Sequence, residues 1–224
     1  LGGGMMGWGA DKVRKPEWSD MEWHLRRWLF YTWLSGDFIV EMHVHNLDLI
    51  NWAMNAHPVS CLAQGGRLAR TKPIYGNVHD HISVQYEYPG GVRVTHLGRQ
   101  MDKCSGGNGV NLQGTQGKTY FDFGNATIEG AKPFKYDGPS VNPAVQEYAD
   151  MITAIRSNRP INEGRQVAES TMTALMGRMS AYTGRSLKWS WVMNQSKLDL
   201  SPPALAFTDV PERPVAIPGF AKLI

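Results

Sequence analysis

Residues 33–52 read Trp-Leu-Ser-Gly-Asp-Phe-Ile-Val-Glu-Met-His-Val-His-Asn-Leu-Asp-Leu-Ile-Asn-Trp, and this stretch decides how the chain is interpreted. Residues 41–48 of this stretch carry four ionisable side chains among apolar ones: Glu41, His43, His45 and Asp48. Ser35 or Asp37 can cap a helix here, and the apolar spacing suits a half-buried helix. In such a helix Glu41, His45 and Asp48 share one face, while His43 points elsewhere.

This cluster has three interpretations. In the favoured one, His45 is a general acid or base and Glu41, one turn away, orients it or tunes its pKa. In the second, His45 is a core histidine bonded to a backbone carbonyl. In the third, a metal ion is bound by five side chains: Glu41, His43, His45, His79 and His81. The third requires residues 41–45 to be extended, whereas the flanking pattern favours a helix.

Length and composition describe an ordinary globular chain. It has 224 residues, 42% hydrophobic and 19% charged, with a formal net charge of +3 spread along the sequence. Since no basic stripe exists, a nucleic-acid function is not expected. No run of apolar residues is long enough for a membrane span. Cys61 and Cys104 match no metal-binding spacing and are interpreted as two free thiols, with one disulfide as the alternative.

The hydrophobic pattern predicts helices at both ends of a central run of strands. An aromatic-rich helix is expected over 20–33, with Arg26 and Arg27 on its polar side. Asn142-Pro143 starts a helix to about residue 157, and another spans 165–182, where Gly184 stops it. The apolar residues expected to face the interior from that last helix are Val167, Met172, Leu175, Met176 and Met179.

The strands lie between these helices. A strand is expected over 59–63, and residues 82–88 and 92–97 flank Pro89-Gly90-Gly91 as a hairpin. Residues 112–122 read as strand, turn and strand. The order predicts an α+β fold: an open-faced, mainly antiparallel sheet with helices packed on one face. We divide the chain into an irregular lead-in (1–18), one substrate-binding and oligomerisation domain (19–194) and a proline-rich extended arm (195–224).

Four further residues are candidate substrate contacts besides Asp48. Arg67 follows a flexible Gly-Gly pair, where it can hold a hydroxyl or carboxylate group; the alternative is a sheet-edge charge that discourages aggregation. Tyr75 and His81 lie just before the first hairpin strand, and we choose His81 over His79. Trp33 belongs to an aromatic group that forms either core or the wall of a cleft.

The motif of residues 33–52 resembles the second-domain motif of the Gfo/Idh/MocA oxidoreductases, the glucose-fructose oxidoreductase and inositol dehydrogenase family. The resemblance spans about 18–192 and continues through these segments: Gly65-Gly66-Arg67, Asp80-His81, Tyr86-Glu87-Tyr88-Pro89, Gly114-Thr-Gln-Gly117, Glu169-Ser170-Thr171 and Gly177-Arg178-Met179. The chain is most similar to a bacterial subgroup, often exported by the twin-arginine route, that carries Trp-Leu-Ser-Gly-Asp. A periplasmic and a cytoplasmic location both remain open.

The resemblance implies a dihydrodipicolinate-reductase-like C-terminal domain whose open sheet face forms a homo-oligomer interface. It also implies that His45 moves the proton of a carbohydrate hydroxyl while hydride passes to or from a nicotinamide. The family's acid is commonly aspartate, and here it is Glu41. The sequence has no Gly-x-Gly-x-x-Gly between a strand and a helix, so NAD or NADP is expected from a separate Rossmann domain or partner and not from this chain alone.

Three functions follow from these expectations. The first is the substrate-binding and acid–base domain of an NAD(P)-dependent oxidoreductase acting on a sugar, cyclitol or glycoside. The second is a non-catalytic carbohydrate-binding or assembly domain. The third is a glycosidase or lyase that uses NAD transiently, so that the net reaction is no oxidation.

Overall fold

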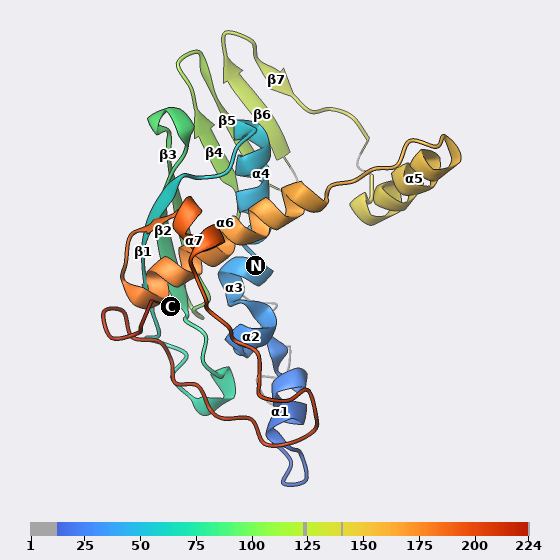
Figure 1. The fold of residues 1–224 in the computed structure, drawn as a ribbon. Helices are drawn as coiled ribbons and strands as arrows, with labels where there is room; N and C mark the ends of the chain where they lie inside the picture. Colours follow the sequence, from blue (N-terminus) through green and yellow to red (C-terminus); the bar gives the residue numbers. More distant parts are fainter. Residues whose placement is uncertain (1–12, 123–124, 140, 224) are drawn as a thin grey trace. The chain divides into compact units, whose positions relative to one another are not determined.

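The computed structural model describes residues 13–122, 125–139 and 141–223, which form two compact units. The first unit comprises residues up to Gly107 together with Glu169 onward, and the second comprises Asn108–Ala168. The first unit carries the residues discussed as a site. Its helices and its sheet follow the α+β plan expected from the sequence (Figure 1).

The N-terminal helical region of the first unit is a series of short helices. They are α1 (Asp20–Arg26), η2 (Trp28–Phe30), α2 (Thr32–Ser35), α3 (Phe38–Glu41) and α4 (Val44–Met54). Ser19 caps α1 by accepting a hydrogen bond from the Glu22 amide at 3.2 Å. The prediction of one helix over 20–33 is wrong, because the chain turns at Arg27 and Tyr31. Residues 38–54 are likewise two helices, separated by a turn at Met42 and His43.

Arg27 corrects a second expectation, because its side chain is buried and not on a polar face. The guanidinium donates a hydrogen bond to the carbonyl of Ile74 at 2.7 Å. It also lies over the rings of Trp23 and Phe30, at 5.4 and 4.7 Å from their centroids. Since α1 ends at Arg26, the next side chain turns inward, and the helical pattern that placed Arg27 beside Arg26 does not apply.

The sheet of the first unit is antiparallel, in the order β3-β2-β1-β8. Its strands are β1 (Ser60–Gly66), β2 (His81–Glu87), β3 (Arg93–Arg99) and β8 (Leu187–Lys188). The predicted hairpin is confirmed: β2 pairs with β3 around the turn η4 (Pro89–Gly91), where Gly90 and Gly91 have φ of 78° and 77°. A further turn, η3 (Pro73–Tyr75), precedes β2.

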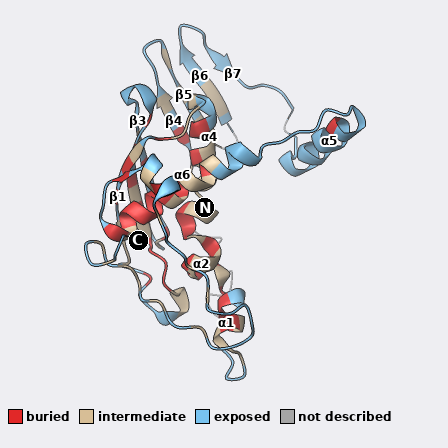
Figure 2. Ribbon diagram, in the orientation of Figure 1, coloured by how far each residue is buried: buried red, intermediate tan, exposed pale blue. Residues whose placement is uncertain are grey.

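One face of this sheet is covered by α6 (Gly164–Thr183). The Tyr86 hydroxyl donates to the carbonyl of Thr173 at 3.0 Å, and the Ser180 hydroxyl accepts from the amide of Ala63 at 2.8 Å. A Cβ atom at Gly177 would lie 2.2 Å from the Tyr86 hydroxyl, so the closeness of helix and strand requires glycine there. Buried residues gather along this contact (Figure 2). Of the predicted inward side chains of α6, Val167 is instead exposed.

The opposite face of the sheet is open. Its side chains include Leu62, Gln85, Thr95 and Leu97, which are exposed, and Leu62 is in register with Gln85 and Thr95. The predicted architecture, an antiparallel sheet with helices on one face, is therefore confirmed. α7 (Trp189–Asn194) follows β8.

The proline-rich segment that follows α7 runs along the first unit. Its backbone pairs with α1, since the Met21 amide donates to the carbonyl of Thr208 at 3.1 Å. Near the end of α6 the Gly219 amide donates to the carbonyl of Thr183 at 3.0 Å. The segment is thus anchored at several points on the unit.

The second unit holds a separate antiparallel sheet, β4-β5-β6-β7, and α5. The strands are β4 (Val110–Gln113), β5 (Gly117–Asp122), β6 (Asn125–Gly130) and β7 (Phe134–Lys135), and α5 is Pro143–Arg156. The strand, turn and strand expected over 112–122 is present as β4 and β5. Asn142 caps α5 and Pro143 is its first residue, as predicted.

No helix in the described ranges is long and apolar enough to span a membrane. Cys61 is buried and Cys104 is exposed, and both are free thiols, as expected.

Candidate functional site

Glu41 and His45 lie on the consecutive short helices α3 and α4. Glu41 is the last residue of α3 and is half-buried, while His45, on the first turn of α4, is exposed. Burial raises the pKa of the Glu41 carboxyl, and the nearby imidazole of His45 partly opposes that rise. Within the described part of the chain, Oε2 of Glu41 is buried and has no hydrogen-bond donor. A carboxyl of this kind holds its proton closer to neutral pH than an exposed one does.

Asp48 lies one turn beyond His45 and is held by α6. The Ser170 hydroxyl donates to its carboxylate at 2.6 Å. Next to it, Asn51 donates to the hydroxyls of Ser170 and Thr173, at 3.2 and 3.1 Å, and accepts from the Tyr88 hydroxyl at 2.6 Å. These bonds fix α4 against α6 and the sheet. Asp48 therefore has a structural partner, and its role in substrate binding stays a prediction.

His43, which was expected to lie off the face of Glu41 and His45, meets a partner that the sequence did not identify. Its Nδ1 lies 2.8 Å from Nε2 of His96 on β3. Burial lowers the pKa of His43 to about 4 and that of His96 to about 3. Both imidazoles are therefore neutral at physiological pH, and one must donate to the other.

Asp37 is the buried centre of a second network. Its carboxylate accepts hydrogen bonds from the amide of Phe38 at 2.6 Å, the amide of His79 at 2.9 Å and the hydroxyl of Tyr182 at 2.6 Å. Burial raises the pKa of Asp37 to about 6, although these donors and Arg178 act in the opposite direction. Asp37 was predicted only as a cap; its two distant partners carry no local sequence signal.

The other predicted site residues are separated. Arg67 donates to the backbone carbonyls of Arg70, Lys72 and Gly76, so its guanidinium holds its own loop together. His81 lies on the open face of the sheet and contacts the carboxylate of Asp80, Nδ1 to Oδ1, at 2.8 Å. Asp80, which is buried, also accepts from three backbone amides. Tyr75 packs edge-on against Phe30 with centroids 5.4 Å apart.

These positions do not form the alternative metal site. His43 pairs with His96, His79 lies 2.9 Å from the carbonyl of Ala216, and His81 lies against Asp80. Across the described residues, no three His, Cys, Asp or Glu side chains are arranged to hold a metal ion.

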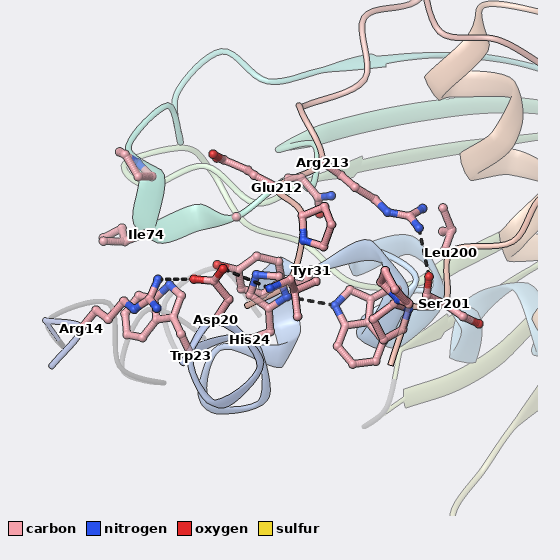
Figure 3. Close-up of a pocket in the computed structure, with 18 of the residues that line it drawn as sticks. Arg14, Asp20, Trp23, His24, Tyr31, Ile74, Leu200, Ser201, Glu212 and Arg213 are labelled. Carbon is pink, nitrogen blue, oxygen red and sulfur yellow. Dashed lines mark hydrogen bonds and ion pairs between the residues drawn. The ribbon is translucent and has the colours of Figure 1, made fainter. Parts of the chain in front are cut away.

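Trp33 lines a cavity of about 790 Å³ between α1, α2 and the proline-rich segment (Figure 3). Its indole N–H donates to Nδ1 of His24 at 3.2 Å, and His24 stacks on Tyr31 with centroids 3.6 Å apart. Trp23 completes this aromatic wall, and Pro202, Pro203 and Pro211 of the proline-rich segment also line the cavity. No residue of α3 or α4 is among the described lining residues. The cavity and the pair of Glu41 and His45 are therefore distinct features.

The charges around this cavity are largely neutralised. Its described lining contains three carboxylates, Asp20, Asp199 and Glu212, and two guanidinium groups, Arg14 and Arg213. Arg14 forms an ion pair with Asp20 at 2.6 Å. Arg213 donates to the backbone carbonyls of Ser201 and Asp199, at 3.1 and 3.4 Å. The charges of Arg14 and Asp20 thus cancel, which leaves the carboxylates of Asp199 and Glu212 against the single charge of Arg213.

Comparison with known proteins agrees with the expected family. Residues 13–120 match the family model of the GFO/IDH/MocA C-terminal domain. This segment therefore belongs to the C-terminal domain of the Gfo/Idh/MocA oxidoreductases, as the motif of residues 33–52 indicated. No curated protein sequence is significantly similar to the chain.

Solved structures of oxidoreductases share the fold. An aldose-aldose oxidoreductase from Caulobacter crescentus, complexed with glycerol, is 19% identical with a TM-score of 0.59, over 79% of this chain and 52% of that one. A UDP-N-acetylglucosamine 3-dehydrogenase from Acidithiobacillus ferrooxidans is 19% identical with a TM-score of 0.55, and the match covers 64% of this chain and 46% of the dehydrogenase. An oxidoreductase from Agrobacterium radiobacter, in complex with NAD+, L-tartaric acid and magnesium, is 14% identical with a TM-score of 0.52. The match covers 66% of this chain and 47% of that oxidoreductase. The chain spans about half the length of these proteins, and at such identities the likeness establishes the fold.

Proposed function

We propose that this chain supplies the substrate-binding and acid–base half of an NAD(P)-dependent oxidoreductase acting on a sugar, cyclitol or glycoside. The observation that carries the proposal is the pair of Glu41 and His45. A carboxyl with a raised pKa lies beside an exposed imidazole, in a segment whose family consists of oxidoreductases. The structural relatives named above include enzymes of sugars and of a sugar nucleotide, and one holds NAD+.

The described residues do not fit a dinucleotide. Every strand pair among them is antiparallel, and a dinucleotide fold requires parallel strands with a glycine-rich turn. In the proposal the nicotinamide is held by a Rossmann domain or partner, and it takes or gives the hydride. His45 removes or returns the hydroxyl proton of the substrate, and Glu41 sets the orientation and charge of that imidazole. The open sheet face is the proposed interface for a second copy.

Replacing His45 by alanine tests the assignment. In the complete enzyme, turnover of a reactive sugar or cyclitol should fall by about two to four orders of magnitude, since a positioned acid or base contributes that much. Formation of reduced nicotinamide across a panel of sugars and cyclitols measures it. His57→Ala is the control, because His57 stacks on Trp189 at 3.9 Å, away from the pair. Unchanged turnover in His45→Ala would remove His45 from the mechanism, and sugar binding without nicotinamide-dependent turnover would favour a non-catalytic binding domain.

We also propose that the cavity beside Trp33 binds carbohydrate at a subsite separate from the acid–base pair, and that it favours a neutral ligand. Aromatic faces stack on the C–H faces of a sugar ring, and the surplus of carboxylates disfavours phosphate or carboxylate groups. Trp33→Ala should weaken binding of glucose or myo-inositol about tenfold, as expected for the loss of one stacking contact. Tryptophan fluorescence titration measures this. Trp52→Ala is the control, since Trp52 is 70% exposed on α4. Tighter binding of glucose 6-phosphate than of glucose would contradict the charge argument.

A further inference from the structure

Asp37 is placed to control Glu41 through the backbone. The amide of Glu41 donates to the carbonyl of Asp37 at 3.1 Å, and the two residues bound the single turn of α3. A helix of four residues has too few internal hydrogen bonds to fix its own direction. Its direction must come from what holds its first residue and from its buried side chains, Phe38 and Ile39.

The backbone of Asp37 is strained. Its φ of 76° and ψ of 163° fall in a region that is almost restricted to glycine, where other residues cost about 1–3 kcal/mol. Gly36, just before it, also has a positive φ, and a Cβ atom there would lie 2.8 Å from Cβ of Val40. The chain therefore enters α3 through two unusual conformations. An aspartate is found where glycine would be less strained, so the carboxylate must contribute something that glycine lacks.

That contribution is the connection of three elements. Oδ1 of Asp37 accepts from the first amide of α3, while Oδ2 accepts from the His79 amide before β2 and from the Tyr182 hydroxyl of α6. Arg178, also buried on α6, donates to the carbonyl of Gly36 at 3.4 Å. The start of α3 is thus tied to the sheet and to the long helix at once.

We propose that Asp37 is a positioning residue for the acid–base pair: by tying the start of α3 to β2 and α6, it fixes where the Glu41 carboxyl lies. This inference rests on the proposed function, in which Glu41 and His45 act together. It assigns to Asp37 no contact with substrate; the aspartate acts through the backbone of α3.

Tyr182→Phe is the mildest test. It removes the 2.6 Å hydrogen bond to Asp37 but retains the ring, whose centroid lies 4.1 Å from that of His79. Tyr86→Phe is the matched control, because Tyr86 is also buried and its hydroxyl bonds to α6, at the carbonyl of Thr173, without touching Asp37. The measurement is the pKa of the Glu41 carboxyl by carbon-13 NMR, with the unfolding midpoint recorded for each variant.

In Tyr182→Phe we expect the pKa of Glu41 to fall toward its ordinary value, because a displaced α3 exposes the carboxyl to water. In Tyr86→Phe the pKa of Glu41 should equal that of the wild type. Equal shifts in the two variants would mean a general loosening of α6 and would overturn the proposal, as would no shift in Tyr182→Phe.

Asp37→Gly separates the backbone from the carboxylate. Glycine accepts the φ of Asp37 without strain but cannot bond to His79 or Tyr182. We expect this variant to lose the raised pKa of Glu41 as well; a Glu41 pKa equal to that of the wild type would show that the carboxylate is not needed. The titration requires no turnover. If His45→Ala leaves turnover unchanged, the proposed reaction fails while the effect of Asp37 on Glu41 is still measured.

Discussion

Acidification from pH 7 to pH 4 should remove about 3 kcal/mol of unfolding free energy for each of the paired histidines, His43 and His96. Burial lowers their pKa values to about 4 and about 3, from an ordinary value of 6.5. The cause is geometric, since the two rings hydrogen-bond to each other at 2.8 Å between α4 and β3. One added proton places a charge in the core, and when both rings are protonated neither facing nitrogen can accept, so the hydrogen bond is lost.

The direction of the effect follows from which state binds protons first. Below about pH 6.5 the unfolded chain protonates both histidines, whereas the folded chain does so only near pH 4 and pH 3. The stability that the two neutral histidines contribute is therefore fully present above their pKa in the unfolded chain, and it is lost as the pH falls toward their pKa values in the folded chain. Asp37 has the opposite effect on stability, because burial raises its pKa to about 6. Between that pH and its ordinary pKa, acidification stabilises the folded chain through Asp37. Comparison with a variant therefore separates the contribution of the histidine pair from that of Asp37.

His96→Gln provides that comparison. Urea unfolding of wild type and variant at pH 7 and at pH 4 gives the change in unfolding free energy for each, and we expect a clearly smaller change in the variant. His57→Gln serves as the control and should keep the wild-type pH dependence. If His96→Gln lost as much stability on acidification as the wild type, protonation of the pair would not drive acid unfolding.

Local signals in the sequence predicted much of the fold because the structures they determine are themselves local. Asn142-Pro143 and Gly184 act within one turn of a helix, and Pro89-Gly90-Gly91 acts within one hairpin. Hydrophobic periodicity failed where a helix was short. Arg27 was placed on a polar face by a helical pattern, and α1 ends one residue before it.

The networks around the site depend on contacts between distant residues, so no local pattern contains them. His43 meets His96 across 53 residues, and Asp37 meets Tyr182 across 145. The motif of residues 33–52 did predict helical structure around Glu41, His45 and Asp48, although as one helix and not as the separate helices α3 and α4. It could not show that Asp48 bonds to Ser170, or that His81 lies on the open sheet face.

Replacing Asp80 by alanine should cost about 3–5 kcal/mol of unfolding free energy. The carboxylate is buried, and its Oδ2 accepts from the amides of Leu68, Ala69 and Arg70 at 2.8, 2.6 and 2.9 Å. Burial alone would raise the pKa of Asp80, but these amides and His81 outweigh it, so the pKa is lowered. The stability that the Asp80 carboxylate contributes is thus present above its pKa in the unfolded chain. It is lost as the pH falls through the lower pKa in the folded chain. Alanine leaves the three amides without their acceptor.

Asp80→Asn separates charge from shape and should cost less than Asp80→Ala. The amide oxygen of asparagine can still accept from the three backbone amides. Its NH₂ group then faces Nδ1 of His81, which must become an acceptor and carry its proton on Nε2 instead. Nitrogen-15 NMR of the His81 ring should report that exchange of tautomers. Asp199→Ala is the control, since Asp199 is exposed and accepts from the Ser201 amide at 2.8 Å; it should change stability by no more than about 0.5 kcal/mol. Equal losses for Asp80→Ala and Asp199→Ala would mean that the loop before β2 is held by Arg67 and its three carbonyl contacts rather than by the buried carboxylate.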